Sequence, residues 1–424
     1  MNRKKILFYS VLFITIYFIG LVTAVYKFFP YYYIKNFKNK IEISLAREPK
    51  VPVIETKKKI EENSNKKGNI LKTFKLPEKI QLLNSTPLNH FNLNWARVEN
   101  EDIGKLSYFD FEKDRIHYLN QDDEIVLKKI NLSIKDIEDK AGGWVRGGIK
   151  SYFKIKDLEL VYVAFEKNFC AKSSIFDINT GREIISFPCV PDYENHDLNG
   201  TGGAFLKIDE NRFMLSVGTP TASSKKIDDL AQDPNSPYGK FLLFEINSKN
   251  DLSFRVFSSG HRNPQGVISI YNNIIAVEHG PMGGDEINII KEENNYGWPF
   301  FSVGSHYDLR KISKDKKNSV LPLYGFNPSI AINQIQKCPK SYEEYYSPLK
   351  CISVSSFKGG IFFLLTDEKL EKVINVEQLN FETRIRKFKI FGDNLYIGTD
   401  YDGLIFGSIE IMKKNKPLIN YKIK

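Results

Sequence analysis

The stretch Ser259–Trp298 reads SGHRNPQGVISIYNNIIAVEHGPMGGDEINIIKEENNYGW and carries the clearest structural signal in the chain. Two apolar runs, Val267–Ile270 and Ile274–Val277, flank the turn Tyr271–Asn273. Short apolar runs on both sides of an Asn-rich turn are typical of a β-hairpin. The hairpin therefore indicates β-structure at the centre of this stretch.

Similar short runs, separated by turn residues, extend on both sides of the hairpin. They are Leu106–Phe111, Leu160–Phe165, Phe205–Ile208, Phe213–Val217, Phe241–Ile246, Ile352–Val354, Ile361–Leu365 and Leu395–Gly398. The turns Asp209–Asn211 and Gly392–Asn394 also precede strands, as Tyr271–Asn273 does. Such weak repetition over roughly 330 residues predicts radially repeated four-stranded sheets, as in a β-propeller. A large β-sandwich or a two-domain β-protein fits the pattern nearly as well.

Polar side chains gather where the hairpin begins, on a turn whose shape is fixed by Pro264 and Gly266. They are His261, Arg262, Asn263 and Gln265. At the other end of the hairpin, a Gly-Pro step and two further glycines precede Asp285 and Glu286. Carbonyl and carboxylate oxygens that converge in this way suit a hard cation such as calcium.

Three motifs in fixed order, GHRNPQG at 260–266, EHGPMGGDEIN at 278–288 and NYGWP at 295–299, closely resemble the glucose/sorbosone dehydrogenase family. AQDPN at 231–235 and PSIA at 328–331 add to the resemblance, which covers roughly residues 89–410. The family consists of soluble quinoproteins that use pyrroloquinoline quinone (PQQ). The resemblance implies an all-β, six-bladed propeller with the ligand site at the mouth of its central channel.

The resemblance also assigns site residues. It implies that the cofactor is bound by Arg262, Asn263, Gln265, Lys358, Arg384 and Arg386. Arginine suits this role because its planar guanidinium matches a carboxylate of the quinone. The carbonyls of Gly280 and Pro281 would hold the catalytic calcium, and Glu286 and the carbonyl of Tyr296 match a second calcium site of some members. Taken singly, Arg-x-Arg and Lys-Gly-Gly are more often solvated surface features.

One part of the match fails, at the residue that removes the proton from the sugar hydroxyl. Family members use a His there, but the alignment puts Gly200 at that position and Ala204 where an Arg is expected. A lost general base costs about 10² to 10⁴ in rate. His196 or Asp197 could supply the base if the loop is shifted, whereas His279 also occurs in relatives that have the usual base and is interpreted as structural.

The net charge of +10 is concentrated at the N-terminal end. Residues 1–80 contain 17 Lys and Arg against 6 Asp and Glu, a local +11, so residues 81–424 sum to −1. The folded body therefore lacks the basic surface that nucleic-acid binding requires.

The N-terminal residues predict export and attachment to a membrane. Residues 6–25 carry no charge and follow Arg3, Lys4 and Lys5, which is typical of a transmembrane helix with a cytoplasmic basic flank. A cleaved signal peptide is the alternative. The expected organisation is a cytoplasmic tip and anchor at 1–27, a basic linker at 28–88, the propeller at 89–415 and a tail at 416–424. The protein would be single-pass in the inner membrane, with the propeller on the periplasmic side.

The four cysteines allow two interpretations. Export favours disulfides between near neighbours, Cys170 with Cys189 and Cys338 with Cys351, although four buried thiols are equally compatible with the spacing.

These features predict a membrane-anchored, PQQ- and calcium-dependent aldose dehydrogenase that passes electrons to a respiratory acceptor. The alternative is a non-catalytic propeller that serves as a binding module because it has lost the catalytic His. A hydrolase finds no support, since neither Gly-x-Ser-x-Gly nor His-Glu-x-x-His occurs.

Overall fold

A computed structural model describes the body of the chain. It covers the backbone of strands within residues 72–120, and residues 147–168, 170–191, 198–220, 224–310, 312, 319–381, 383–400 and 404–411. The predicted anchor and most of the predicted linker lie outside these residues, and so does His196. Within the described part, no helix is long and apolar enough to span a membrane.

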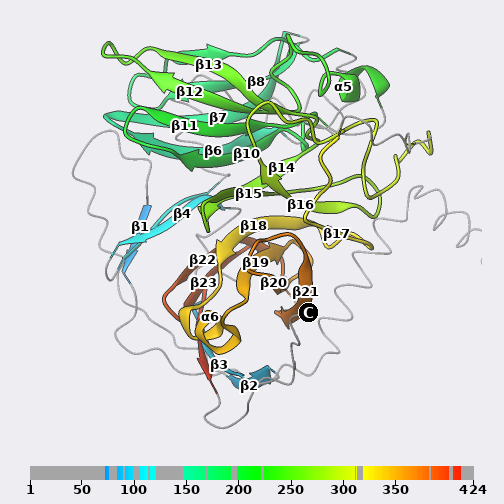
Figure 1. Ribbon diagram of the computed structural model, residues 1–424. Coiled ribbons are helices and arrows are strands. Elements are labelled where there is room, and N and C mark those ends of the chain that lie inside the picture. Colours follow the sequence, from blue (N-terminus) through cyan, green and yellow to red (C-terminus); the bar gives the residue numbers. More distant parts are fainter. Residues whose placement is uncertain are drawn as a thin grey trace, which may run out of the picture. The chain divides into compact units, whose positions relative to one another are not determined.

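The chain folds as an all-β propeller, and five blades of four or five antiparallel strands are present (Figure 1). Four of them consist of consecutive strands: β6 (Gly148–Ile155), β7 (Leu158–Lys167), β8 (Cys170–Asp177) and β9 (Glu183–Ser186); β10 (Gly202–Lys207), β11 (Arg212–Val217), β12 (Lys240–Ile246) and β13 (Leu252–Ser259); β14 (Pro264–Ile270), β15 (Asn273–Glu278), β16 (Asp285–Ile290) and β17 (Tyr324–Phe326); β18 (Ile332–Lys337), β19 (Lys350–Ser356), β20 (Gly360–Thr366) and β21 (Val373–Asn380). The predicted strands are all observed.

The fifth blade joins strands from both ends of the described chain. Its strands, in spatial order, are β2 (Asn84–Leu88), β3 (Phe91–Val98), β24 (Leu404–Ile411), β23 (Asn394–Thr399) and β22 (Ile385–Phe391). A separate three-stranded sheet contains β1 (Lys72–Lys75), β5 (Arg115–Asn120) and β4 (Leu106–Glu112). Strands β1 and β2 fall within the range assigned above to the linker.

The predicted hairpin is β14–β15. Its turn has two central residues, Tyr271 and Asn272, because Asn273 of the predicted turn already pairs with Ile270. Tyr271 and Asn272 have φ of 51° and 58°. Both central residues of a type I′ turn need positive φ, and Asn tolerates this conformation well. The strand that follows is buried, with Ile275 and Val277 inaccessible to solvent.

The core lies between neighbouring blades. One cluster joins Val161 and Val163 of β7 to Phe213 and Leu215 of β11 in the next blade. Phe213 also stacks on Phe244 of its own blade, with ring centroids 4.7 Å apart. Apolar side chains on facing sheets hold the blades together. The loops that connect the strands do not form this core and can therefore carry a site.

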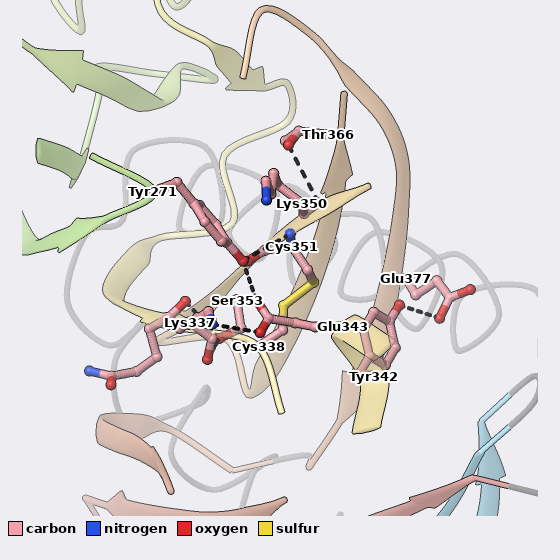
Figure 2. Close-up of a disulfide and its surroundings, with 11 residues drawn as sticks. Tyr271, Lys337, Cys338, Tyr342, Glu343, Lys350, Cys351, Ser353, Thr366 and Glu377 are labelled. Atoms are coloured by element: carbon pink, nitrogen blue, oxygen red, sulfur yellow. Dashed lines mark hydrogen bonds and ion pairs between the residues drawn. A yellow bond between two sulfur atoms is a disulfide. The ribbon is translucent and has the colours of Figure 1, made fainter. Parts of the chain in front are cut away.

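Both predicted disulfides are present, Cys170–Cys189 and Cys338–Cys351. The second links the end of β18 to β19, around the short helix α6 (Lys340–Tyr346). Figure 2 shows the Tyr271 side chain pointing from the β14–β15 turn to this disulfide. Its hydroxyl donates to the carbonyl of Cys351 at 3.0 Å and also contacts Glu343 of α6. The turn of one blade is therefore fastened to the helix of the next.

Candidate functional site

Arg262 lies at the entrance to β14 and connects both ends of the hairpin. Its backbone N–H donates to Glu278 at 2.9 Å, and its guanidinium donates to the carbonyls of His279 at 3.1 Å and Gly280 at 2.8 Å. Its own carbonyl accepts from the backbone N–H of Thr219 at 2.7 Å. The side chain is thus fixed in place, and only 7% of the residue is exposed.

Asn263 and Gln265 contact the segment in which the proton acceptor was expected. The Oδ1 atom of Asn263 accepts from the backbone N–H of Gly202 at 3.1 Å and from Nε2 of Gln265 at 2.7 Å. The segment around Gly200 therefore lies beside the turn that carries Arg262 and Asn263. Its residues, Gly200 to Ala204, carry no side chain that could accept a proton.

Arg384 and Arg386 share one carboxylate and one aromatic ring. Both donate to Asp400, through Nε of Arg384 at 2.8 Å and through Nε and Nη2 of Arg386 at 2.7 Å. Their guanidinium carbons lie 4.2 and 4.6 Å from the ring centre of Phe357. One acid against two guanidiniums leaves one excess positive charge.

His279 lies where these cations meet Arg262. Its ring stacks on Phe357 with centroids 5.4 Å apart. Burial, followed by the charges of Arg262, Arg384 and Arg386, lowers the pKa of His279 to about 3. The imidazole is therefore neutral at physiological pH. The charges of three arginines that were predicted to bind the cofactor all lower its pKa.

Lys358 is the exception among the predicted cations. It follows Phe357 directly, but its side chain is exposed and its ammonium donates to the carbonyl of Ser329 at 2.6 Å. The structure thus brings Lys358 to the edge of the cluster without joining it to the three arginines.

All four residues predicted to bind metal line one small cavity. Gly280, Pro281, Glu286 and Tyr296 surround it together with Glu278, which the sequence analysis did not identify. Glu278 and Glu286 are directly opposite each other on β15 and β16, and Nδ2 of Asn288 donates to Glu278 at 2.7 Å and to Glu286 at 3.3 Å.

A cation would be more favourable at the Glu278–Glu286 end of this cavity than at the Gly280 end. Burial, and secondarily the nearby Glu278, raise the pKa of Glu286 to about 8. A divalent cation would relieve this cost by pairing with the two carboxylates. The Gly280 carbonyl, by contrast, already accepts from Arg262. Within the described chain, no three His, Cys, Asp or Glu side chains form a metal cluster, so carbonyls would have to complete the ligand set.

Ser258, His261 and Glu278 have the connectivity of a catalytic triad. The Ser258 hydroxyl is 2.9 Å from Nε2 of His261, and Nδ1 of His261 is 3.3 Å from Glu278. All three residues are 5% exposed or less, so no substrate reaches the hydroxyl. The trio fixes the loop that carries Arg262. Sequence analysis missed it, although each residue belongs to or adjoins a quoted motif.

Two aromatic rings cover Arg262. Its guanidinium carbon lies 5.5 Å from the ring centre of Trp298 and 5.7 Å from that of Tyr307. The Trp298 ring in turn contacts His306, with centroids 4.7 Å apart. Trp298 belongs to the motif NYGWP, but no sequence signal pointed to Tyr307.

The fold and the site together define a class of β-propeller proteins whose loops bring several arginines together. The chain belongs to the glucose/sorbosone dehydrogenase family, whose sequence model matches residues 191–406. Aldose sugar dehydrogenase YliI of Escherichia coli K12 is 39% identical over 141 residues, which are 32% of this chain and 37% of the relative. Quinoprotein glucose dehydrogenase B of Acinetobacter calcoaceticus is 43% identical over 96 residues, 20% of each chain.

The alignments thus span 37% of the length of the first of these curated relatives and 20% of the second. Over a longer range, the crystal structure of the soluble aldose sugar dehydrogenase from Escherichia coli, in its apo form, matches with a TM-score of 0.51 and 18% identity. It covers 80% of this chain and 99% of that one, and it shows that the fold is shared.

Proposed function

We propose that this protein is a membrane-anchored sugar dehydrogenase that oxidises an aldose hydroxyl with PQQ as hydride acceptor and calcium as its metal. The observation that carries the proposal is the convergence of Arg262, Arg384 and Arg386 on the neutral His279. Within the described residues, Asp400 is the carboxylate that both arginines of the pair contact, so the cluster carries excess positive charge that suits an anionic ligand. The names of the relatives point to a quinone and a sugar.

Each residue has a distinct role in this scheme. Arg384 and Arg386 would bind carboxylates of the cofactor, Arg262 would face its reactive oxygens, and Lys358 would close the site from the edge. Asn263 and Gln265 hold the neighbouring loop in place. The chemistry supplied by the bound quinone is acceptance of the hydride from the sugar carbon.

Calcium would occupy the cavity between Glu286, Tyr296, Gly280 and Pro281. The two opposed carboxylates Glu278 and Glu286 support this assignment. The proton acceptor would come from the loop that precedes Gly200, with His196 or Asp197 as the candidate.

The finer architecture belongs to the same proposal. The sheet β1–β5–β4 would be the sixth blade, because β4 contacts β6 of one blade and β22 of another. Both β6 and β22 are edge strands of their sheets. The apolar segment 6–25 would anchor the propeller on the periplasmic side of the inner membrane, near respiratory electron acceptors.

The test uses the full-length protein in detergent, supplied with PQQ and calcium. We expect aldose-dependent dye reduction and a cofactor-induced rise in melting temperature, because a ligand stabilises the state to which it binds. Arg262→Ala should abolish the rise, since the cation that faces the cofactor is lost. Arg255→Gln, an exposed arginine on β13, is the matched control and should retain it.

The outcomes separate the two functions considered. Stabilisation without turnover by any aldose would favour the non-catalytic binding module. No stabilisation in the wild-type protein, or full stabilisation of Arg262→Ala, would contradict the proposed cofactor site.

A further inference from the structure

The aromatic cover of Arg262 is held by contacts with the neighbouring blade. Trp298 and Tyr307 belong to the segment 295–310, which follows β16. The facing loop, 224–238, connects β11 to β12 in the preceding blade and contains the short helix α5 (Lys225–Asp229).

Two sets of contacts join this loop to the segment. Nε2 of Gln232 donates to the carbonyl of Trp298 at 2.5 Å, and Nδ2 of Asn295 donates to Oε1 of Gln232 at 2.6 Å. Asp228 of α5 forms an ion pair with Arg310, whose backbone N–H and Nε also contact Asp308. The neutral contacts hold the start of the segment, and the ion pair holds its end.

Asp228 carries a carboxylate that is almost fully buried, with 2% of the residue exposed. Burial raises its pKa to about 6, against the charges of Arg310 and Arg262, so it is ionised at neutral pH. The indole N–H of Trp298 has no hydrogen-bond partner among the described residues and lies close enough to Asp228 to favour the ionised form. The carboxylate thus interacts with both the cover and the residue beneath it.

We propose that Asp228 and Arg310 form an interblade clamp that positions Trp298 and Tyr307 over Arg262 and so shapes the sugar-binding side of the site. This inference rests on the proposed function for the identity of the ligand. The clamp is assigned to the sugar side because it holds the rings over Arg262 and not the guanidinium itself, which is fixed by the carbonyls of His279 and Gly280. Arg384 and Arg386 come from a different blade and are held by Asp400. Tyr307 is 56% exposed, so its ring is accessible to a ligand from solution.

The first measurement does not depend on catalysis. Hydrogen exchange of the full-length protein is compared among wild type, Asp228→Asn, Arg310→Gln and the control Arg255→Gln. Loss of a hydrogen bond to a charged group should speed exchange across 295–310 by about 10- to 100-fold in either clamp variant, and not in the control. Unchanged exchange in both clamp variants would overturn the clamp.

The second measurement tests the positioning role. With PQQ, calcium and D-glucose or another accepted aldose, both clamp variants should raise KM about 10-fold, the loss that one such contact produces. Their cofactor-induced melting shift should stay at the wild-type value, and the double variant should resemble the single ones. An unchanged KM, or an equal loss of cofactor binding, would overturn the assignment to the sugar side.

The two proposals fail in different ways. If the wild-type protein turns over no aldose while exchange still increases in the clamp variants, the clamp stands and the dehydrogenase proposal is lost.

Discussion

At the residue scale, Lys240 shows how a buried charge organises the loop that carries α5. Its ammonium donates to the carbonyls of Leu230 at 2.9 Å, Ala231 at 2.8 Å and Tyr238 at 3.0 Å, with 1% of the residue exposed. Gln232 follows Ala231 directly, so the same ammonium fixes the loop that reaches Trp298. The side chain of a single lysine thus binds three backbone carbonyls of this loop.

Lys240→Met should lower the free energy of unfolding by about 3 kcal/mol at pH 7, because three buried carbonyls lose their donor. Burial lowers the pKa of Lys240 from 10.5 to about 8. Between these values the unfolded chain binds the proton and the folded chain does not, so wild-type stability rises with pH. The gap between wild type and variant should therefore widen, by up to about 3 kcal/mol, from pH 8 to pH 10.5. Urea unfolding across this range measures it, and a gap that narrows would contradict the lowered pKa.

At the element scale, helix α6 depends on contacts from three directions. The disulfide Cys338–Cys351 lies at its start, Tyr271 reaches it from the preceding blade, and its own Tyr342 and Tyr346 donate to the buried Glu377 at 2.5 and 2.7 Å. Figure 2 shows Tyr342 and Glu377 on the far side of the helix from Tyr271. The helix has only seven residues, too few for stability without these contacts.

Replacing both Cys338 and Cys351 with Ala should cost about 3 kcal/mol of stability, the value expected for a loop of this size. Non-reducing urea unfolding provides the measurement. Tyr271→Phe leaves the disulfide and removes only the hydroxyl contacts, so we expect a loss of about 1 kcal/mol. A larger loss in Tyr271→Phe than in the double cysteine variant would show that the hydroxyl, and not the disulfide, holds the helix.

At the scale of the whole molecule, the propeller depends on pairing between β3 and β24. Their register runs antiparallel over the full strand, with Ala96 opposite Phe406. Truncation after residue 403 should therefore abolish cooperative unfolding, because β3 and β23 each lose one of their two partner strands and the sheet is divided. Circular dichroism during urea unfolding monitors this change. Truncation after Ile411 is the control, and a sharp transition in the shorter protein would argue against closure through this sheet.

Local patterns predicted much of the fold. The apolar runs and turns gave the strands, and the spacing of the cysteines gave the correct pairing as one of the two interpretations considered. Arg262 and the Arg384–Arg386 pair were found through motifs, and the charges of all three lower the pKa of His279.

The missing parts of the site come from pairs that are distant in sequence. Asp228 and Arg310 are on different blades, and neither belongs to a motif that signals a partner. Glu278 was overlooked because its role depends on β-sheet register, which sets it opposite Glu286. Lys358 shows that a matching motif does not determine where a side chain points, because its ammonium contacts the carbonyl of Ser329 and not the arginines.

The blade that contains β3 and β24 also constrains the order of events during synthesis. Strand β3 emerges from the ribosome early and can pair with β2 at once, but its other edge must wait for β24. During that interval the nascent chain carries an open strand edge, the feature that invites mispairing and aggregation. Contacts of such high sequence separation also slow folding. The propeller is thus expected to complete its ring only after the last blade is made, and to be vulnerable until then.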